Sequence, residues 1–299
     1  MMNITAVIVT YYPNEDVLTR LVSALVSQVD RLLIVDNNSQ DFDFSTIVAS
    51  SKQISLHVNH ENLGVAAGYN QGVSFAIEQS SSHVILFDQD SLPTPTMVGE
   101  LVNALTVANT KGLSVAAVGP CYQEISGGDQ SPFVKVSGIG LSRVNHDGKT
   151  PVEVDHLISS GCLIPIEAFK SIGLFEEQLF IDYVDTEWCL RARYKGFALL
   201  GIPSATMMHD LGDGHLTILK KRIVLHSPLR HYYLIRNGIW LIKQPWITWQ
   251  WRVLDAIRLT KVFLVLSIFP KNSFNHFKMM LTGVLHAVTS RMGKFLPRS

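Results

Sequence analysis

Short apolar runs alternate with helical segments along the first 215 residues, and this alternation constrains the fold more than any other feature of the chain. Five runs have the length and the β-rich composition of strands: 4–10, 31–36, 54–59, 84–90 and 114–120. Three segments between them have helical character: 14–28, 65–79 and 94–109. Strands that alternate with helices form a mostly parallel sheet covered on both faces. We therefore predict an α/β fold.

Composition is that of a globular chain. The 299 residues are 47% hydrophobic and 17% charged, which argues against disorder and suits one large domain or a domain with an appendage. The three cysteines lack CxxC spacing, which fits a reducing compartment better than a disulfide framework. The N-terminus lacks a basic region, and its apolar run is broken at Tyr11-Tyr12-Pro13, so we interpret it as a first strand and not a signal peptide. We expect a cytoplasmic location.

The net charge of zero conceals a division between two parts of the chain. Residues 1–215 hold 11 Lys and Arg against 24 Asp and Glu, a net charge of −13, whereas residues 216–299 hold 14 against one, a net charge of +13. The basic part also carries four of the five tryptophans: Trp240, Trp246, Trp249 and Trp251. We therefore predict two domains, 1–225 and a helical, basic, aromatic-rich extension at 226–299.

The extension suggests an anionic membrane surface as a partner. Aromatic rings settle at the headgroup level, and each nearby cation adds about 1 kcal/mol of attraction to anionic lipid. Its apolar runs at 262–269 and 279–288 are shorter than a membrane-spanning helix and too apolar to favour nucleic acid. We predict that it lies on the membrane surface, and the alternative is that it only packs on the main domain.

The stretch VILFDQDSLP at 84–93 ends a buried strand with two carboxylates. Asp88 and Asp90 lean the same way because a strand repeats every two residues. A solvated turn would explain them, and so would a cation or a substrate hydroxyl, because parallel sheets bind ligands beyond the carboxyl ends of their strands. Thr10 and Asp36 end two other strands, and Asp36 begins either an Asx-rich turn or a nucleoside site. In a parallel sheet these strand ends gather along one edge.

Glycines recur every four residues in NLGVAAGYNQG at 62–72. Gly64, Gly68 and Gly72 share one helix face, which close packing on the sheet would explain. A glycine-rich helix start also lets backbone amides approach a diphosphate. The first strand is followed by TYYPNED and not by GxGxxG, which argues against a dinucleotide-binding fold.

The second half of the main domain adds further polar candidates. HLISSGCLIPIEAF at 156–169 is typical of a strand that runs into a helix, and FIDYVDTEWCLRARYKGF at 180–197 predicts a helix over about 183–195 that ends at Gly196. Helix capping explains one carboxylate at its start, but three stand there: Asp182, Asp185 and Glu187. His209 ends a later apolar run before a glycine-rich loop. A lone histidine there is more often structural than a metal ligand.

Taken in order, seven segments resemble the family 2 nucleotide-sugar glycosyltransferases of GT-A fold. The segments are VTYYPNEDVLTRLVSAL, VDNNS, HENLGVAAGYNQG, FDQDSLP, SSGCLI, FIDYVDTEWCLRARYKG and MMHDLGD. The resemblance covers residues 4–215 and is strongest to the bacterial rhamnosyltransferases that build cell-surface polysaccharides such as O-antigen. HSPLRHYYLIRN at 226–237 resembles the same subgroup.

The resemblance implies roles for individual residues. It implies a divalent cation, Mn²⁺ or Mg²⁺, bound by Asp90 and His209, and Asp185 as the general base of a transfer that inverts the anomeric centre. Seven residues would bind the nucleotide-sugar: Thr10, Tyr11, Asp36, Asn62, Gly64, Asp88 and Gln89. Four more are candidates on the acceptor or donor side: Gly161, Glu187, Trp188 and Arg191.

The implied reaction moves L-rhamnose from dTDP-rhamnose to a hydroxyl of a lipid-linked or growing surface glycan, on the cytoplasmic face of the inner membrane. An alternative within the family is another donor such as UDP-galactofuranose. Outside it, a haloacid-dehalogenase-like phosphatase also carries DxD, but Leu92 and the late position of the motif count against that class. A non-catalytic nucleotide-sugar or lipid-binding protein is disfavoured because the carboxylates and His209 are all present.

Overall fold

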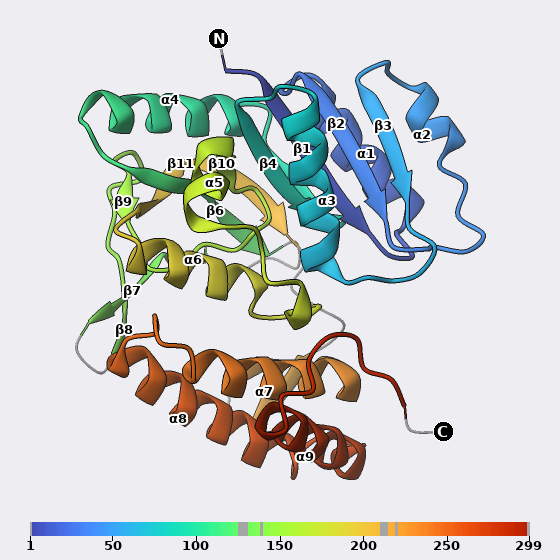
Figure 1. The fold of residues 1–299 in the computed structure, drawn as a ribbon, viewed down its shortest axis with the longest axis vertical. Coiled ribbons are helices and arrows are strands. Elements are labelled where there is room, and N and C mark those ends of the chain that lie inside the picture. Colours follow the sequence, from blue (N-terminus) through green and yellow to red (C-terminus); the bar gives the residue numbers. More distant parts are fainter. Residues whose placement is uncertain (1, 125–130, 138–139, 210–214, 219–220, 298–299) are drawn as a thin grey trace.

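The computed structural model describes residues 2–124, 131–137, 140–209, 215–218 and 221–297. In Figure 1 a twisted sheet with helices on both faces lies over a layer of three C-terminal helices. The α/β class predicted from the alternating pattern is confirmed, as are the C-terminal helices.

One half of the main sheet is parallel, as predicted. Its four strands are β1 (Ile4–Thr10), β2 (Arg31–Asp36), β3 (Ile54–Val58) and β4 (His83–Asp88), in the order β3-β2-β1-β4. Thr10 pairs with Asp36 across β1 and β2, and Val9 pairs with Asp88 across β1 and β4. The register therefore brings the polar ends of three strands together at one edge of the sheet.

The other half of the sheet is mixed, which the alternating pattern did not predict. Its strands are β5 (Ser91–Pro93), β6 (Val115–Glu124), β9 (Val152–Glu153), β10 (Leu163–Pro165) and β11 (Ala198–His209). β10 runs antiparallel between β4 and β6, β11 runs parallel to β6, and the short β5 runs antiparallel to β11. Two separate hairpins pair β7 (Val134–Ser137) with β8 (Gly140–Arg143) and β12 (His215–Ile218) with β13 (Lys221–Val224).

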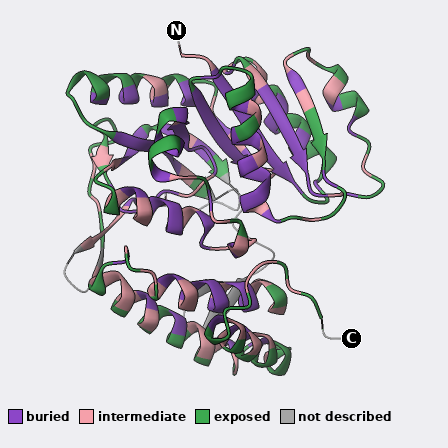
Figure 2. Cartoon of the chain, in the orientation of Figure 1, coloured by how far each residue is buried: buried purple, intermediate pink, exposed green. Residues whose placement is uncertain are grey.

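Helices cover both faces because successive residues of the central strands are apolar and point to opposite faces of the sheet. The helices of this unit are α1 (Glu15–Val26), α2 (Ser45–Ala49), α3 (Val65–Glu78), α4 (Met97–Thr110), α5 (Ile166–Ile172) and α6 (Val184–Tyr194), with a 3₁₀ turn at Glu177–Leu179. Val7 and Val9 of β1 join the core under α3, α5 and α6, whereas Ala6 and Ile8 join the core under α1 and α4. Figure 2 shows the resulting buried centre of the sheet.

The glycine stripe of α3 packs on β1, as the spacing predicted. A Cβ atom at Gly68 would lie 2.8 Å from a methyl carbon of Val9, and one at Gly72 would lie 2.3 Å from a methyl carbon of Val7. Larger side chains at these two positions would push α3 away from the sheet. The start of α3, which lies at the edge of the sheet, would move as well.

Three helices form the C-terminal layer: α7 (Pro228–Ile242), α8 (Trp249–Leu266) and α9 (Ser273–Val288). Hydroxyl caps begin the first two, since Ser227 and Thr248 accept from backbone amides one turn later. The layer has its own apolar core, which includes Ile235, Leu259 and Met280. Among the described helices, none combines the length and the hydropathy that crossing a membrane requires.

Candidate active site

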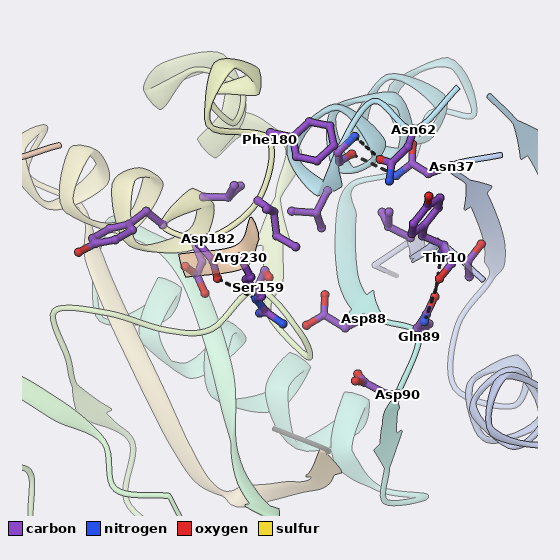
Figure 3. Close-up of a pocket in the computed structure, with 18 residues that line it drawn as sticks. Thr10, Asn37, Asn62, Asp88, Gln89, Asp90, Ser159, Phe180, Asp182 and Arg230 are labelled. Carbon is purple, nitrogen blue, oxygen red and sulfur yellow. Dashed lines mark hydrogen bonds and ion pairs between the residues drawn. The ribbon is translucent and has the colours of Figure 1, made fainter. Parts of the chain in front are cut away.

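A pocket of about 390 Å³ lies at the edge where the parallel strands end. The ends of β1 and β4, the start of α3, the segment before α6 and Arg230 of α7 surround it (Figure 3). Eight residues selected from the sequence line it: Thr10, Tyr11, Asn62, Gly64, Asp88, Gln89, Asp90 and Asp185. Residues that are far apart in the sequence therefore share one site.

Hydrogen bonds from neighbouring strand ends hold the β1 side of the pocket. The buried Asp36 carboxylate accepts from the Thr10 hydroxyl at 2.8 Å and from the Ser39 amide and hydroxyl at 2.7 and 2.6 Å. Asp36 thus lies beneath this wall and fixes it, while the next residue, Asn37, lines the pocket itself.

Gln89 ties the DQD stretch to the end of β1. Its side-chain oxygen accepts from the Tyr11 amide at 2.8 Å, and its side-chain amide donates to the Tyr11 carbonyl at 3.3 Å. The Tyr11 ring remains 48% exposed beside the pocket. An exposed ring on a fixed backbone can stack on a planar base.

The two carboxylates of the DQD stretch open into the same pocket (Figure 3). The Tyr69 hydroxyl donates to Asp88 at 2.6 Å. Burial and the negative charge of Asp88 raise the pKa of Tyr69 well above its ordinary value, so Tyr69 keeps its proton at neutral pH. This hydrogen bond fixes the orientation of the Asp88 side chain on the strand-end wall of the pocket.

The backbone register places His209 near this pair. His209 at the end of β11 pairs with Ser91 of β5, the residue that follows Asp90, although the side chain of His209 and the glycine-rich loop after it lie outside the described residues. Within the described ranges, no three His, Cys, Asp or Glu side chains are grouped closely enough to hold a metal ion. Oxygen donors suit Mg²⁺ and Mn²⁺, and such ions complete their shells with phosphate and water, so the carboxylates fit a cation shared with a substrate.

Gly64 allows the start of α3 to approach the opposite wall. It has φ +89°, and a Cβ atom there would lie 2.5 Å from the Phe180 carbonyl oxygen. That oxygen accepts from the Val65 amide at 2.8 Å, and the Asn62 side chain accepts from the Gly64 amide at 2.9 Å. Only glycine fits this contact. Gly64 is therefore explained by its approach to Phe180, whereas the other two glycines of the motif are explained by packing of the helix on the sheet.

The opposite wall is the segment 178–185, whose backbone is strained. Phe180, Asp182 and Tyr183 have φ values of +67°, +61° and +68°, a region that non-glycine residues rarely occupy. Two buried side chains of α7 hold the segment: Asn237 donates to the carbonyls of residues 179, 181 and 182 at 2.7 to 3.0 Å, and Arg236 donates to those of residues 178 and 179. The C-terminal layer therefore shapes the pocket.

Asp185 lies inside the first turn of α6, because the N-cap position belongs to Tyr183. Its carboxylate accepts from the Thr186 amide at 2.7 Å and lies 3.6 Å from the His156 Nε2 atom. Burial alone would raise the pKa of Asp185, but His156 and the Thr186 amide together outweigh it and lower the pKa below its ordinary 3.8. Asp185 is therefore a carboxylate at neutral pH, as a proton acceptor must be.

Asp182 and Arg230 form an ion pair on the same side of the pocket, with 3.3 Å between Arg230 Nε and the carboxylate. Burial raises the pKa of Asp182, and Arg230 opposes that rise. Arg230 also faces the space into which Asp88 points (Figure 3). It is the cation that α7 contributes to the pocket lining.

The four candidates for the acceptor or donor side are not among the described residues that line the pocket. Glu187 pairs with Arg191 at 2.7 Å, and Arg191 also donates to the carbonyls of residues 172 and 174. The buried Trp188 packs on Phe169 and donates to the residue 173 carbonyl at 2.9 Å. Gly161 has φ +79° and donates to the residue 86 carbonyl at 2.7 Å. These contacts join α6 and β10 to the rest of the fold.

Several lining residues were not selected from the sequence: Asn37, Ser159, Phe180, Tyr183 and Arg230. Asp182, noted from the sequence among the carboxylates at the helix start, lines the pocket as well. Asn37 stands in the VDNNS segment and Arg230 in HSPLRHYYLIRN, so both segments were noticed without these positions. Arg230 lies 142 positions after Asp88 in the sequence, and only the packing of α7 brings the two to one pocket.

Comparison with known proteins identifies the sequence family of the chain. Residues 6–171 match the model of Glycosyl transferase family 2. The chain is 30% identical over 294 residues to the dTDP-rhamnosyl transferase RfbF of Shigella flexneri, covering 97% of both proteins. It is 26% identical over 284 residues to the galactofuranosyltransferase GlfT1 of Mycolicibacterium smegmatis, covering 85% of this chain and 91% of that protein.

Two solved structures share the fold at 13% identity. A crystal structure of GalNAc-T7 with UDP, GalNAc and Mn²⁺ superposes with a TM-score of 0.60 over 97% of this chain and 58% of the other. A crystal structure of S. aureus TarS 1–349 superposes with a TM-score of 0.59 over 97% of this chain and 82% of the other.

Proposed function

The chain belongs to glycosyl transferase family 2, and from this premise we propose that it transfers L-rhamnose from dTDP-rhamnose to a hydroxyl of a surface glycan, with inversion at the anomeric carbon. The glycosyltransferase activity follows from the family, and the donor is proposed from the dTDP-rhamnosyl transferase relative. One observation carries the mechanism: Asp88 and Asp90 lie on one wall of a single pocket and Asp185 on the other.

The two walls suit the two halves of the reaction. The acceptor hydroxyl oxygen attacks the anomeric carbon, the bond from that carbon to the diphosphate oxygen breaks, and the hydroxyl proton passes to Asp185. The leaving dTDP takes the bonding electron pair, and Arg230 offsets its negative charge. One displacement by one nucleophile inverts the centre, which is why a single base suffices.

We place a divalent cation at the DQD stretch, held by Asp90 and by His209, with Mn²⁺ favoured by the nitrogen ligand and Mg²⁺ as the alternative. When bound, such an ion neutralises the diphosphate in the ground state and on leaving. Asp88, held by Tyr69, would orient the ribose or a bound water. The Tyr11 ring, Asn37 and Asn62 would contact the nucleoside.

A donor panel tests this proposal. We expect thymidine diphosphate to raise the melting temperature more with Mn²⁺ than with EDTA, and dTDP-rhamnose to be turned over faster than UDP-galactofuranose. Faster use of UDP-galactofuranose, the runner-up because of the galactofuranosyltransferase relative, would replace the donor. Hydrolysis of a simple phosphate ester would favour the phosphatase class, and binding without any turnover would favour a non-catalytic protein.

We also propose that the C-terminal layer, residues 226–299, rests on an anionic membrane on the cytoplasmic side, where a lipid-linked acceptor would be presented. Exposed apolar side chains follow one face of α8 and one face of α9. They are Trp249, Val253, Ile257 and Leu264 on α8, and Phe274, Phe277, Leu281, Leu285 and Val288 on α9. Their spacing of three and four residues makes two stripes, and the exposed Lys261 and Lys278 lie beside them.

Arg258 is one of the basic residues of this layer, but in the structure it makes contacts within the protein. It pairs with Asp255 at 2.8 Å and donates to the Tyr183 hydroxyl. The Tyr183 hydroxyl donates to Asp255 at 2.7 Å. Arg258 therefore joins α8 to the start of α6, and a membrane test must leave it intact.

Replacing Phe274 and Leu285 with Glu tests the membrane proposal. We expect this double variant to lose binding to vesicles that contain anionic lipid while it still binds thymidine diphosphate. Leu113→Glu, at an exposed apolar position on the sheet unit, is the control. Unchanged vesicle binding by the double variant would overturn the proposal.

A further inference from the structure

A second cavity, of about 420 Å³, lies between α6 and α8, and we call it the α6–α8 cavity. It shares Asp182 and Tyr183 with the active-site pocket, so the segment 178–185 forms a wall of both. His156 lines the cavity, and its Nε2 atom lies 3.6 Å from Asp185, which lines the active-site pocket. The base proposed above therefore stands at the junction of the two spaces.

Three side chains of this cavity have polar atoms that need a partner. Within the described ranges, His156 Nε2, Asp182 Oδ2 and Trp251 Nε1 are buried without a partner at hydrogen-bond distance, and His156 Nε2 has only the 3.6 Å ion pair with Asp185. A buried polar group without a hydrogen bond destabilises the fold, so three of them around one cavity indicate a ligand that supplies the missing bonds. Together they offer a donor, an acceptor and an imidazole nitrogen that can do either, which matches hydroxyl groups.

Most of the surface of the α6–α8 cavity is apolar, although Thr186 and the Asp255–Arg258 pair also line it. Val134, Leu234 and Leu254 line it beside the Trp251 ring. A sugar presents apolar C–H faces and a rim of hydroxyls, and an aromatic ring beside scattered polar atoms complements both.

A neighbouring cavity of about 330 Å³ extends this surface. It shares Trp251 and contains Trp246, whose Nε1 atom is also buried without a partner in the described part of the chain. Two tryptophans with unused N–H groups, in adjoining spaces, fit a ligand longer than one sugar.

The charges around both cavities are paired, which favours a neutral ligand. In the α6–α8 cavity, Asp255 pairs with Arg258 at 2.8 Å. In the neighbouring cavity, Asp155 pairs with Arg193 at 2.7 Å. A phosphate group would have to compete for these cations, whereas sugar hydroxyls would not.

We propose that the α6–α8 cavity and its neighbour bind the acceptor as a neutral oligosaccharide end and present one hydroxyl to Asp185. This inference rests on the proposed glycosyl transfer and names its acceptor site. The C-terminal layer then serves the reaction directly, because α8 supplies Trp251 and Leu254.

Filling the cavity tests the proposal. In Leu254→Trp the larger ring would occupy the space that we assign to a sugar, and Val253→Trp, the exposed neighbour on the same helix, is the matched control. The probes are methyl glycosides of rhamnose, galactose and N-acetylglucosamine, followed by saturation-transfer NMR. We expect at least one to bind the wild type and Val253→Trp but not Leu254→Trp, while thymidine diphosphate binds all three.

A second, more conservative variant keeps the proposal testable if Leu254→Trp does not fold. Trp251→Phe keeps a ring and removes only the N–H group, so we expect the Kd for the bound glycoside to rise about 3- to 10-fold, the size of one lost hydrogen bond. Equal glycoside binding by wild type and Leu254→Trp, or no binding to the wild type, would overturn the acceptor site. Failure of every protein to bind thymidine diphosphate or turn over a sugar nucleotide would instead overturn the proposed function.

Discussion

The two walls of the active-site pocket are built in different ways. The strand-end wall, with Thr10 and Asp88, is set by parallel register, because residues paired across β1, β2 and β4 must end at the same edge. The segment 178–185 on the other side has three non-glycine residues with positive φ and is held by Arg236 and Asn237 of α7. One wall has regular backbone geometry and is held by the sheet itself. The other has a strained backbone and depends on the helix α7.

This difference suggests a division of work. A regular wall tolerates the loss of single contacts because the sheet still aligns its residues. A strained wall returns to common backbone angles when its supports are removed, since each such residue costs about 1–3 kcal/mol. Nucleotide binding should therefore depend mainly on the first wall and transfer mainly on the second.

The largest effect should come from Asp185→Asn. We expect the transfer rate to fall by about 10²–10⁴-fold while thymidine diphosphate affinity is nearly unchanged, because the amide keeps the size of the carboxylate and loses its basicity. The N-cap role of Tyr183 makes a purely capping function for Asp185 a poor explanation. A normal transfer rate in steady-state kinetics would move the base to Asp182.

Gly64→Ala should be the most damaging change for stability. The new methyl group would meet the Phe180 carbonyl at 2.5 Å on a backbone with φ +89°, and we expect a loss of about 3 kcal/mol in the free energy of unfolding. Gly112→Ala has a comparable φ of +73° with open space around it, so it isolates the backbone cost, about 1 kcal/mol. Equal losses in denaturant unfolding would mean that the two walls do not touch as described.

Asn237→Ala tests the strained wall by removing a side chain that holds the segment 178–185 in place. Three backbone carbonyls would lose a donor, and we expect about 1–3 kcal/mol less stability and a transfer rate that falls more than thymidine diphosphate affinity does. Asn275→Ala, exposed on α9, is the control. Equal losses of affinity and rate would show that the two walls respond as one unit.

His156→Gln should have the smallest effect, a shift in pH dependence. Asp185 acts as a base when deprotonated, so transfer falls as pH drops through its pKa, which His156 helps to hold below 3.8. Without the imidazole the pKa of Asp185 rises, and the acid limb of the kcat/KM profile should move to higher pH. The stability that Asp185 contributes above pH 3.8, lost as pH falls through its lowered pKa, should shrink as well.

His57→Gln, exposed on β3, is the control and should leave the profile in place. An unmoved acid limb in His156→Gln would mean that His156 does not act on Asp185.

The sequence by itself determined the parallel half of the fold and one wall of the pocket. The strands 4–10 and 31–36 have the bounds predicted for them, because an apolar β-branched run between polar residues has few other ways to be buried. The packing of Gly68 and Gly72 on β1 followed from their spacing. Asp88 and Thr10 could be placed together because the carboxyl ends of parallel strands meet at the same edge of a sheet.

Only the tertiary structure decided the rest. The strand β5 is three residues long, too short for an alternating pattern to identify. A strand was predicted within 156–169, where β10 lies, but its antiparallel direction was not. Two ion pairs of the same chemical type have different positions. The pair of Glu187 and Arg191 joins α6 to the core, whereas the pair of Asp182 and Arg230 lines the pocket. Which charges face a ligand depends on how α6 and α7 are turned against the sheet, and that is fixed by contacts such as those of Asn237, which the sequence does not reveal.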